Sequence, residues 1–233
     1  MALPKINSPT FELKLPSTGQ SVKYRPFLVK EEKILLVAQQ SGELKDILNA
    51  VVQIANNCIY DDIEVEKLPL FDIEYIFINL RSKSVSNVSE VMINDPDDGN
   101  QYKVEIDLDK VIIERPEKEI SNKIDLGDGI GVVMRYPSIT YMNSIGTAVN
   151  DADTAINIIM ACVDKVYDTD NVYEASEYSK EELNDFIMSL SSKQFQNIQE
   201  FFNNQPKVTQ KIKYKTKDGK EKELVLEGLN DFF

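Results

Sequence analysis

The residues of this chain that could bind a metal ion are the carboxylates of two loops, 95–100 and 168–171. Both loops combine Asp and Asn side chains, whose oxygens are ligands that Ca²⁺ prefers. An EF-hand loop beginning at the first of these aspartates would need Gly at its sixth position and Glu at its twelfth, where the chain has Asn100 and Ile106. The second loop fails at its twelfth position, which is Ser179. We interpret the first as a turn and the second as a loop that ends a helix, and we predict no metal site.

Other groups with catalytic potential are scarce. The chain contains no histidine, which removes the commonest general base and the commonest metal ligand, and leaves a serine or cysteine nucleophile without its usual activator. Gly127, Gly129 and Gly131 resemble a phosphate-binding loop, but no Lys-Ser or Lys-Thr pair follows them and acidic residues flank them. We predict no catalytic residue and no cofactor. A glycosidase-like pair among the 39 carboxylates stays a remote alternative.

The two cysteines do not suggest a metal or redox site. Cys58 and Cys162 each lie in an apolar stretch with helical spacing, where a thiol usually behaves as a small hydrophobic group. Their separation matches no zinc or redox motif. We therefore expect both thiols to be buried and unreactive.

The charge of the chain limits its partners. The formal net charge is −13, which repels phosphate backbones and anionic lipid headgroups. No apolar stretch reaches the length of a membrane span, and no apolar segment follows Lys5 as in a secretory signal. We expect a protein that is made in a cytosol, remains there, and binds neither nucleic acid nor membranes.

The elements that position these residues begin with a β-hairpin. Apolar and polar residues alternate over 10–15 and over 21–25, on either side of a turn at 16–19. Pro26 ends this hairpin, and apolar residues then recur with helical spacing. Helices are expected at 27–38, 44–59 and from Pro69 to Leu80.

The middle of the chain predicts strands. A second hairpin joins 89–93 to 102–108 across a segment rich in turn-forming residues. Short strands are expected at 111–113 and 131–134, around a loop that contains 125–129.

The last third predicts helices and a third hairpin. Apolar residues recur three or four apart from 138 to 167, which predicts the longest helix of the chain. Ser179 with Glu182, and Ser191 with Gln194, each fit a capping box that starts a short helix. The third hairpin pairs 207–214 with 222–226 across an Asp-Gly turn.

These elements predict an α+β fold in which three β-hairpins or small antiparallel sheets are interspersed with amphipathic helices. We expect three segments: a hairpin plus helices at 1–84, a central β-hairpin region at 85–137, and a helical region with a C-terminal hairpin at 138–233. They could form one or two compact domains.

The amino-terminal sequence resembles a known family. Leu-Pro-Ser-Thr-Gly at 15–19 is followed by Lys-Tyr-Arg-Pro-Phe-Leu-Val-Lys-Glu-Glu-Lys at 23–33. This run resembles the T-even-type myovirus baseplate protein family, which contains a baseplate hub subunit and a hub assembly catalyst. The close match covers roughly residues 1–40, and the chain's length and order of elements are compatible with the family throughout.

The resemblance implies a non-enzymatic phage tail protein that binds other hub or tail proteins. It implies a structural component of the baseplate hub, with a transient assembly chaperone absent from the mature virion as the alternative. The protein would then lie in the host cytoplasm during assembly and in the tail baseplate if retained. Some relatives carry cysteine pairs that suggest a small metal knuckle, but 94–102 contains no cysteine here, so we carry over no metal.

Two groups of residues are candidates for partner binding. The first hairpin and helix are locally basic on an acidic chain, and such asymmetry can orient a subunit among its neighbours. Aromatic residues at the end of the chain would either pack on the protein's own core or dock on a partner. The candidate residues are Lys14, Lys23, Arg25, Phe27, Lys30, Phe232 and Phe233.

Overall fold

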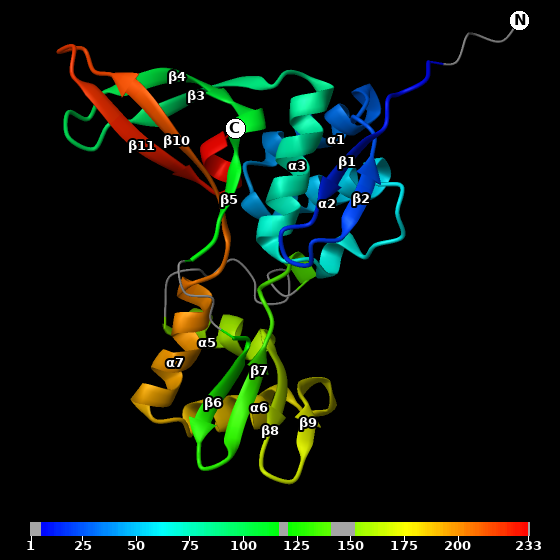
Figure 1. The fold of residues 1–233 in the computed structure, drawn as a ribbon, viewed down its shortest axis with the longest axis vertical. Coiled ribbons are helices and arrows are strands. Elements are labelled where there is room, and N and C mark those ends of the chain that lie inside the picture. The colour runs from blue at the N-terminus through cyan, green and yellow to red at the C-terminus, as the bar shows by residue number, and fades with distance from the viewer. Residues whose placement is uncertain (1–5, 117–120, 141–151, 233) are drawn as a thin grey trace, which may run out of the picture. The chain divides into compact units, whose positions relative to one another are not determined.

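The chain forms two compact units in the computed structural model, which describes residues 6–116, 121–140 and 152–232 (Figure 1). Unit 1 comprises Met1–Glu114 and Pro206–Phe233, and unit 2 comprises Arg115–Gln205. Each unit combines helices with small antiparallel sheets of two to four strands. This confirms the predicted α+β class.

The amino-terminal part of unit 1 is the predicted hairpin followed by three helices. Its elements are β1 (Phe11–Lys14), β2 (Ser21–Tyr24), α1 (Val29–Ser41), α2 (Leu44–Cys58), the short 3-10 helix η1 (Val65–Lys67) and α3 (Leu70–Ser84). The strands alternate as expected, with Leu13, Val22 and Tyr24 buried. Helix α1 ends at Gly42, whose φ of 72° is the left-handed conformation that glycine adopts without strain. Helix α2 packs against both α1 and α3, so this part has one apolar core.

The rest of unit 1 is two small sheets, which include the predicted second and third hairpins. The elements are β3 (Val88–Asn94), β4 (Gln101–Asp107), η2 (Leu108–Lys110), β5 (Ile112–Glu114), β10 (Lys207–Lys215), β11 (Glu221–Glu227) and η4 (Leu229–Phe232). Strands β3 and β4 form a two-stranded sheet, and the order of the other sheet is β11-β10-β5. Residues that lie far apart in sequence therefore complete a single unit.

A buried carboxylate joins the turn between β3 and β4 to strands β10 and β11 of the other sheet. The side chain of Asp95, after β3, accepts hydrogen bonds from Lys222 Nζ at 2.7 Å and from the Tyr214 hydroxyl at 2.7 Å. The turn amides of Asp97 and Asp98 also donate to it. Lys222, followed by Tyr214 and these amides, holds the pKa of Asp95 well below its ordinary value. Loop 95–100 is thus a turn fastened to β10 and β11, as predicted for a turn.

Unit 2 is inserted between two paired strands of unit 1. Glu114, the last residue of β5, pairs with Lys207, the first residue of β10. The chain therefore leaves and re-enters unit 1 at one position of the ladder. The units do not coincide with the three expected segments, because pairing with β5 places the C-terminal hairpin in the same unit as residues 1–84.

Unit 2 is a four-stranded antiparallel sheet with helices packed on its apolar face. The elements are β6 (Lys123–Gly127), β7 (Ile130–Met134), α5 (Ala152–Ala161), β8 (Val163–Tyr167), β9 (Val172–Glu174), η3 (Ala175–Glu177), α6 (Lys180–Met188) and α7 (Ser192–Asn203). The strand order β6-β7-β8-β9 follows the sequence. Val132, Ile198 and Phe201 lie at the centre of its core. Both predicted capping boxes are present, at Ser179 and Ser191.

The predicted helix over 138–167 is wrong at its end, because Val163–Tyr167 is strand β8. The apolar spacing of Val163 and Val166 comes from a β-bulge and not from a helix. Residue 163 pairs with Met134 and Lys165 pairs with Val133, so Asp164 is an extra residue at a β-bulge. Because of the bulge, Val163 and Val166, which are three apart in sequence, both pack into the core, and this separation imitates a helical period. The helix extends over 152–161, and residues 141–151 lie outside the described residues.

Two further predictions, both of loops, are wrong. Lys123–Gly127 is strand β6, so the expected loop at 125–129 begins in a strand and continues into the turn before β7. Loop 168–171 connects β8 to β9 and does not end a helix. Its first residue, Asp168, accepts hydrogen bonds from the amides of Asp170 and Asn171, which makes it a tight turn.

Candidate partner-binding surfaces

Helix α1 exposes an apolar row to solvent. Val29, Leu36 and Val37 are 80%, 54% and 58% exposed. Separations of seven and eight residues place these three side chains on one side of a helix with 3.6 residues per turn. Lys30 and Lys33 are exposed on the same helix. We call these five residues the α1 surface.

The opposite side of α1 is fixed by a buried ion pair. The carboxylate of Glu31 is fully buried and lies 3.0 Å from Nη2 of Arg25. It also accepts a hydrogen bond of 2.9 Å from the amide of Leu28, which caps the helix. Burial opposes ionisation of Glu31, but the hydrogen bonds from Arg25 and Leu28 outweigh it and lower its pKa. Together with buried Leu35, this pair holds the helix against the unit.

The predicted basic residues fall into two groups. Lys14 and Lys23 are exposed on β1 and β2, and Lys30 belongs to the α1 surface. Arg25 differs, because its guanidinium contacts Glu31 and donates 2.9 Å hydrogen bonds to two backbone carbonyls. The three lysines can reach a partner, whereas Arg25 supports the fold. Partner binding by these residues stays a prediction.

The predicted phenylalanines lie inside unit 1 where they are described. Phe27 is buried, and Phe232 is fully buried in η4. The segment that carries Phe232 is held by hydrogen bonds from the Leu229 amide to Glu74 and from the Gly228 amide to the Val208 carbonyl. Phe233 lies outside the described residues. Phe232 thus packs on the protein's own core, one of the two arrangements that the sequence left open.

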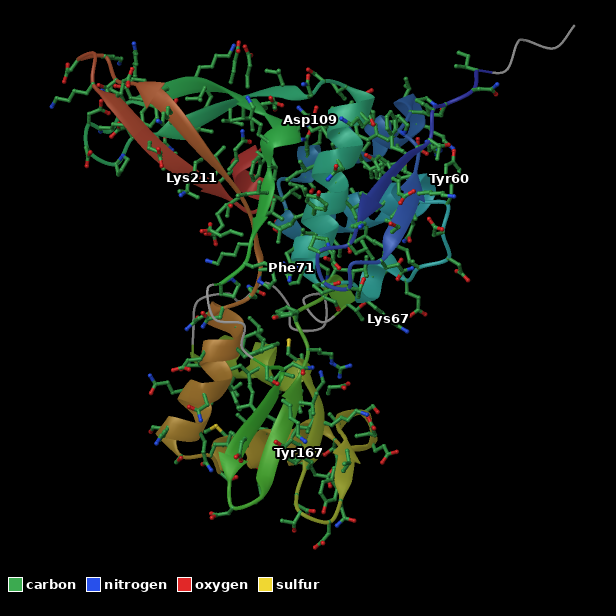
Figure 2. The ribbon with its side chains drawn as sticks, viewed as in Figure 1. Tyr60, Lys67, Phe71, Asp109, Tyr167 and Lys211 are labelled. Carbon is green, nitrogen blue, oxygen red and sulfur yellow. The ribbon has the colours of Figure 1, made fainter. Side chains whose placement is uncertain are left out.

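Sequence reasoning missed the exposed apolar residues of α1. The segment 28–38 contains seven apolar residues, more than one buried stripe of a short helix can hold. That excess was the available signal for a second, solvent-facing row. Unit 1 also exposes Tyr60, which follows α2, and Lys211, on β10 (Figure 2).

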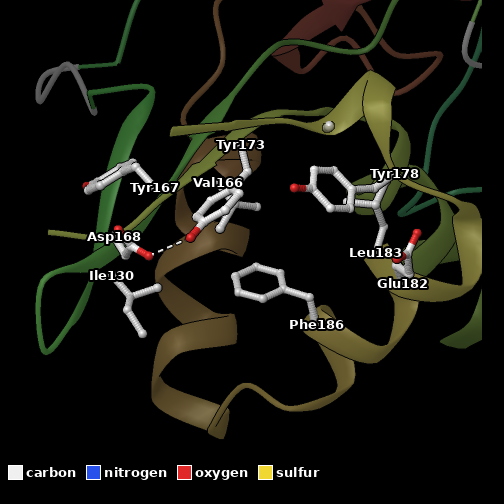
Figure 3. Close-up of a pocket in the computed structure, with 10 residues that line it drawn as sticks. Ile130, Val166, Tyr167, Asp168, Tyr173, Tyr178, Glu182, Leu183 and Phe186 are labelled. Atoms are coloured by element: carbon white, nitrogen blue, oxygen red, sulfur yellow. Dashed lines mark hydrogen bonds between the residues drawn. The ribbon is translucent and has the colours of Figure 1, made fainter. Parts of the chain in front are cut away.

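A second candidate surface is a pocket in unit 2, between strands β8 and β9 and helix α6 (Figure 3). Its volume is about 390 Å³. Val166, Leu183 and Phe186 line it and also pack against the core of the unit, so the pocket is an opening of that core toward solvent. Tyr173 and Tyr178 complete the aromatic lining, with their rings 6.2 Å apart in an edge-to-face arrangement.

Two carboxylates belong to the pocket. Asp168 accepts a 2.7 Å hydrogen bond from the Tyr173 hydroxyl, and this bond, with two turn amides, lowers its pKa. Glu182 accepts a hydrogen bond from the Ser179 amide, which likewise lowers its pKa. Both groups are therefore ionised at neutral pH. An acid–base pair would need one raised pKa, so these values do not favour the carboxylate hydrolase alternative.

The remaining sequence candidates show no reactive environment. Burial raises the pKa of the Cys58 thiol to about 11 and that of the Cys162 thiol to about 12, so neither forms a nucleophilic thiolate at neutral pH. Among the described residues, no group of three or more Cys, Asp or Glu side chains is arranged to hold a metal ion. None of the helices described is both long and apolar enough to cross a bilayer.

The fold and these surfaces define an α+β protein of two units, with an apolar row on one unit and an acidic, aromatic pocket on the other. Comparison with known families gives a match over residues 8–233 to the family described as T4 bacteriophage base plate protein. The chain belongs to this family, which confirms the resemblance seen at its amino terminus and makes it a phage baseplate-related protein. No curated protein and no solved structure matches the chain.

Proposed function

We propose that this protein is a structural component of the baseplate hub of a contractile-tail bacteriophage, where it binds other hub or tail proteins and has no enzymatic activity. Family membership supports a location in the baseplate, because the family match includes both units. The α1 surface carries the binding role. Apolar side chains that stay in contact with water, on a helix fixed from its other side, are typical of a protein interface.

The charges around this surface, two lysines against the exposed Glu32 of the same helix, favour a partner with acidic groups beside an apolar patch. Lys30 and Lys33 lie next to the apolar row, and Lys14 and Lys23 are exposed on the neighbouring part of the chain. Complementary charge would orient the partner and accelerate association more than it would add affinity. Nucleic acid and membranes are not among the proposed partners, because the net charge of −13 repels them.

A phage that carries Leu36→Asp tests the proposal. The substitution places a charge in the apolar row but removes little packing, because Leu36 is half exposed. We expect the amount of this protein in purified particles, measured by quantitative mass spectrometry, to fall about tenfold or more, as for a residue at the centre of an interface. Gln53→Asp is the matched control, since Gln53 is exposed on α2 and lies outside the α1 surface. Unchanged incorporation of the Leu36→Asp protein would contradict the binding role.

A transient assembly chaperone is the alternative, and the acidic character of the chain supports it. An acidic protein can shield a basic partner before assembly. The same mass spectrometry separates the two roles. A hub component is present in finished particles at a fixed ratio to other baseplate proteins, whereas a chaperone is present in infected cells and absent from the particles.

A further inference from the structure

The pocket of unit 2 has a chemistry of its own, distinct from that of the α1 surface. Its floor is apolar, because Val166, Leu183 and Phe186 continue from the core. In Figure 3 the rings of Tyr173 and Phe186 lie on either side of the opening, and the Tyr178 hydroxyl points toward it. Tyrosines that present both an apolar ring and a hydroxyl group are common at the centres of protein interfaces.

The charged side chains that line the pocket are both acidic, although Lys123 Nζ lies 4.5 Å from the centroid of the Tyr167 ring, which also lines it. Asp168 and Glu182 line it, and no Lys or Arg is among its lining residues. Hydrogen bonds from Tyr173, from turn amides and from Ser179 hold both carboxylates in their ionised form. Between Arg115 and Gln205 the sequence has 15 acidic and seven basic residues, a net charge of −8. The field around the pocket therefore attracts cations and repels phosphate and carboxylate groups.

We infer that this pocket binds an exposed segment of a partner protein in which an apolar side chain stands next to a lysine or arginine. The apolar side chain fills the space between Val166 and Phe186, and the cation lies between the carboxylates and the tyrosine rings, where both an ion pair and a cation–π contact favour it. The inference rests on the proposed function, in that the partner belongs to the same assembly. The inference concerns a different surface from the α1 surface, so either proposal can fail while the other holds.

The test uses the purified full-length protein and an array of short overlapping peptides that cover the other virion proteins of the same phage. We expect the peptides that bind to contain an apolar residue beside Lys or Arg. The best of them, measured by isothermal titration calorimetry, should bind more weakly as salt increases, because exposed charges are screened. Exchange of its basic residue for Glu should abolish measurable binding.

Two pairs of variants separate the pocket from the rest of the surface. Glu182→Gln removes the charge but keeps the reach of the side chain that caps α6, and we expect it to weaken peptide binding about threefold. Its control is Glu181→Gln, an exposed neighbour outside the pocket. Tyr178→Ala should weaken binding about tenfold or more, whereas Met188→Ala, exposed on the same helix as Glu182, should not.

Several results would overturn the inference. These are an array with no bound peptide, bound peptides without a basic residue, and equal binding by the Tyr178→Ala and wild-type proteins. A small molecule that co-purifies with the wild-type protein in native mass spectrometry, and is lost from Tyr178→Ala, would show that the pocket takes a metabolite instead. Leu36→Asp should leave peptide binding by the pocket unchanged. The incorporation of the Leu36→Asp protein into particles therefore tests the α1 surface alone and says nothing about peptide binding.

Discussion

Replacement of Phe232 by alanine measures how much the end of the chain contributes to unit 1. The ring is fully buried, and η4, which carries it, packs against β3 and β11. Truncation of a buried Phe typically costs about 3–5 kcal/mol, the sum of lost transfer free energy and the cavity left behind. The cost here should lie near the lower end, about 3 kcal/mol, because η4 is a short 3-10 helix that can relax into the cavity.

Thermal unfolding and hydrogen exchange report this loss. For a chain of this size 1 kcal/mol shifts the Tm by about 2–4 °C, so we expect the Tm of unit 1 to fall by about 6–12 °C. The two units need not unfold together, which requires a measurement that separates them. Hydrogen exchange followed by mass spectrometry should show faster exchange in β3 and β11, with unit 2 unchanged.

Asp231→Ala is the control for a local effect. It removes one hydrogen bond of 2.8 Å, from the amide of Glu227 to the Asp231 carboxylate, and should cost about 1 kcal/mol. A Phe232→Ala protein with wild-type Tm and wild-type exchange in β3 and β11 would refute the reasoning. If that protein were also lost from particles, Phe232 would bind a partner and would not belong to the core.

Three further substitutions test other contacts. Glu31→Gln leaves partly buried Arg25 without its counter-ion and should destabilise unit 1 by about 2–3 kcal/mol in urea unfolding, whereas a change below about 0.5 kcal/mol would mean that α1 is held by apolar contacts alone. The lowered pKa of Asp95 means that its interactions stabilise the fold above the ordinary Asp pKa of about 4 and are lost as pH falls below it. The Tm should therefore fall less for Asp95→Asn than for the wild type between about pH 7 and pH 3, and parallel curves would contradict this. In Gly131→Ala the new Cβ would overlap the Tyr167 hydroxyl oxygen, so the ring must move. A lowered Tm of unit 2 and altered near-ultraviolet circular dichroism are expected, and an unchanged spectrum would disprove the contact.

The hairpins and most helices could be predicted because their signals are local. Alternation of polar and apolar residues sets the hairpins, and the capping boxes at Ser179 and Ser191 set the starts of α6 and α7. Strand β8 could not be predicted in this way, since its apolar spacing depends on a bulge that exists only when it pairs with β7. Local patterns carry no information about a partner strand that is far away in sequence.

The candidate surfaces were only partly predictable. Lys30 and Phe27 are both predicted from the sequence to bind a partner, but Lys30 is exposed beside the apolar row of α1 whereas Phe27 is buried. Sequence patterns show that a residue is apolar but not whether a neighbouring element covers it. The pocket of unit 2 was missed because Tyr173 and Phe186 come from a strand and a helix that meet only in the folded unit.

The pairing of Glu114 with Lys207 dictates an order of events during protein synthesis. All of unit 2 leaves the ribosome while unit 1 still lacks β10 and β11. Until these two strands emerge, β5 and the buried positions of β3 have no partners to pair with or pack against. Unit 2 can fold in that interval, and unit 1 closes only after β10 and β11 have been synthesised. A chain that is terminated early would therefore expose the edge of β5, where other nascent strands could pair with it.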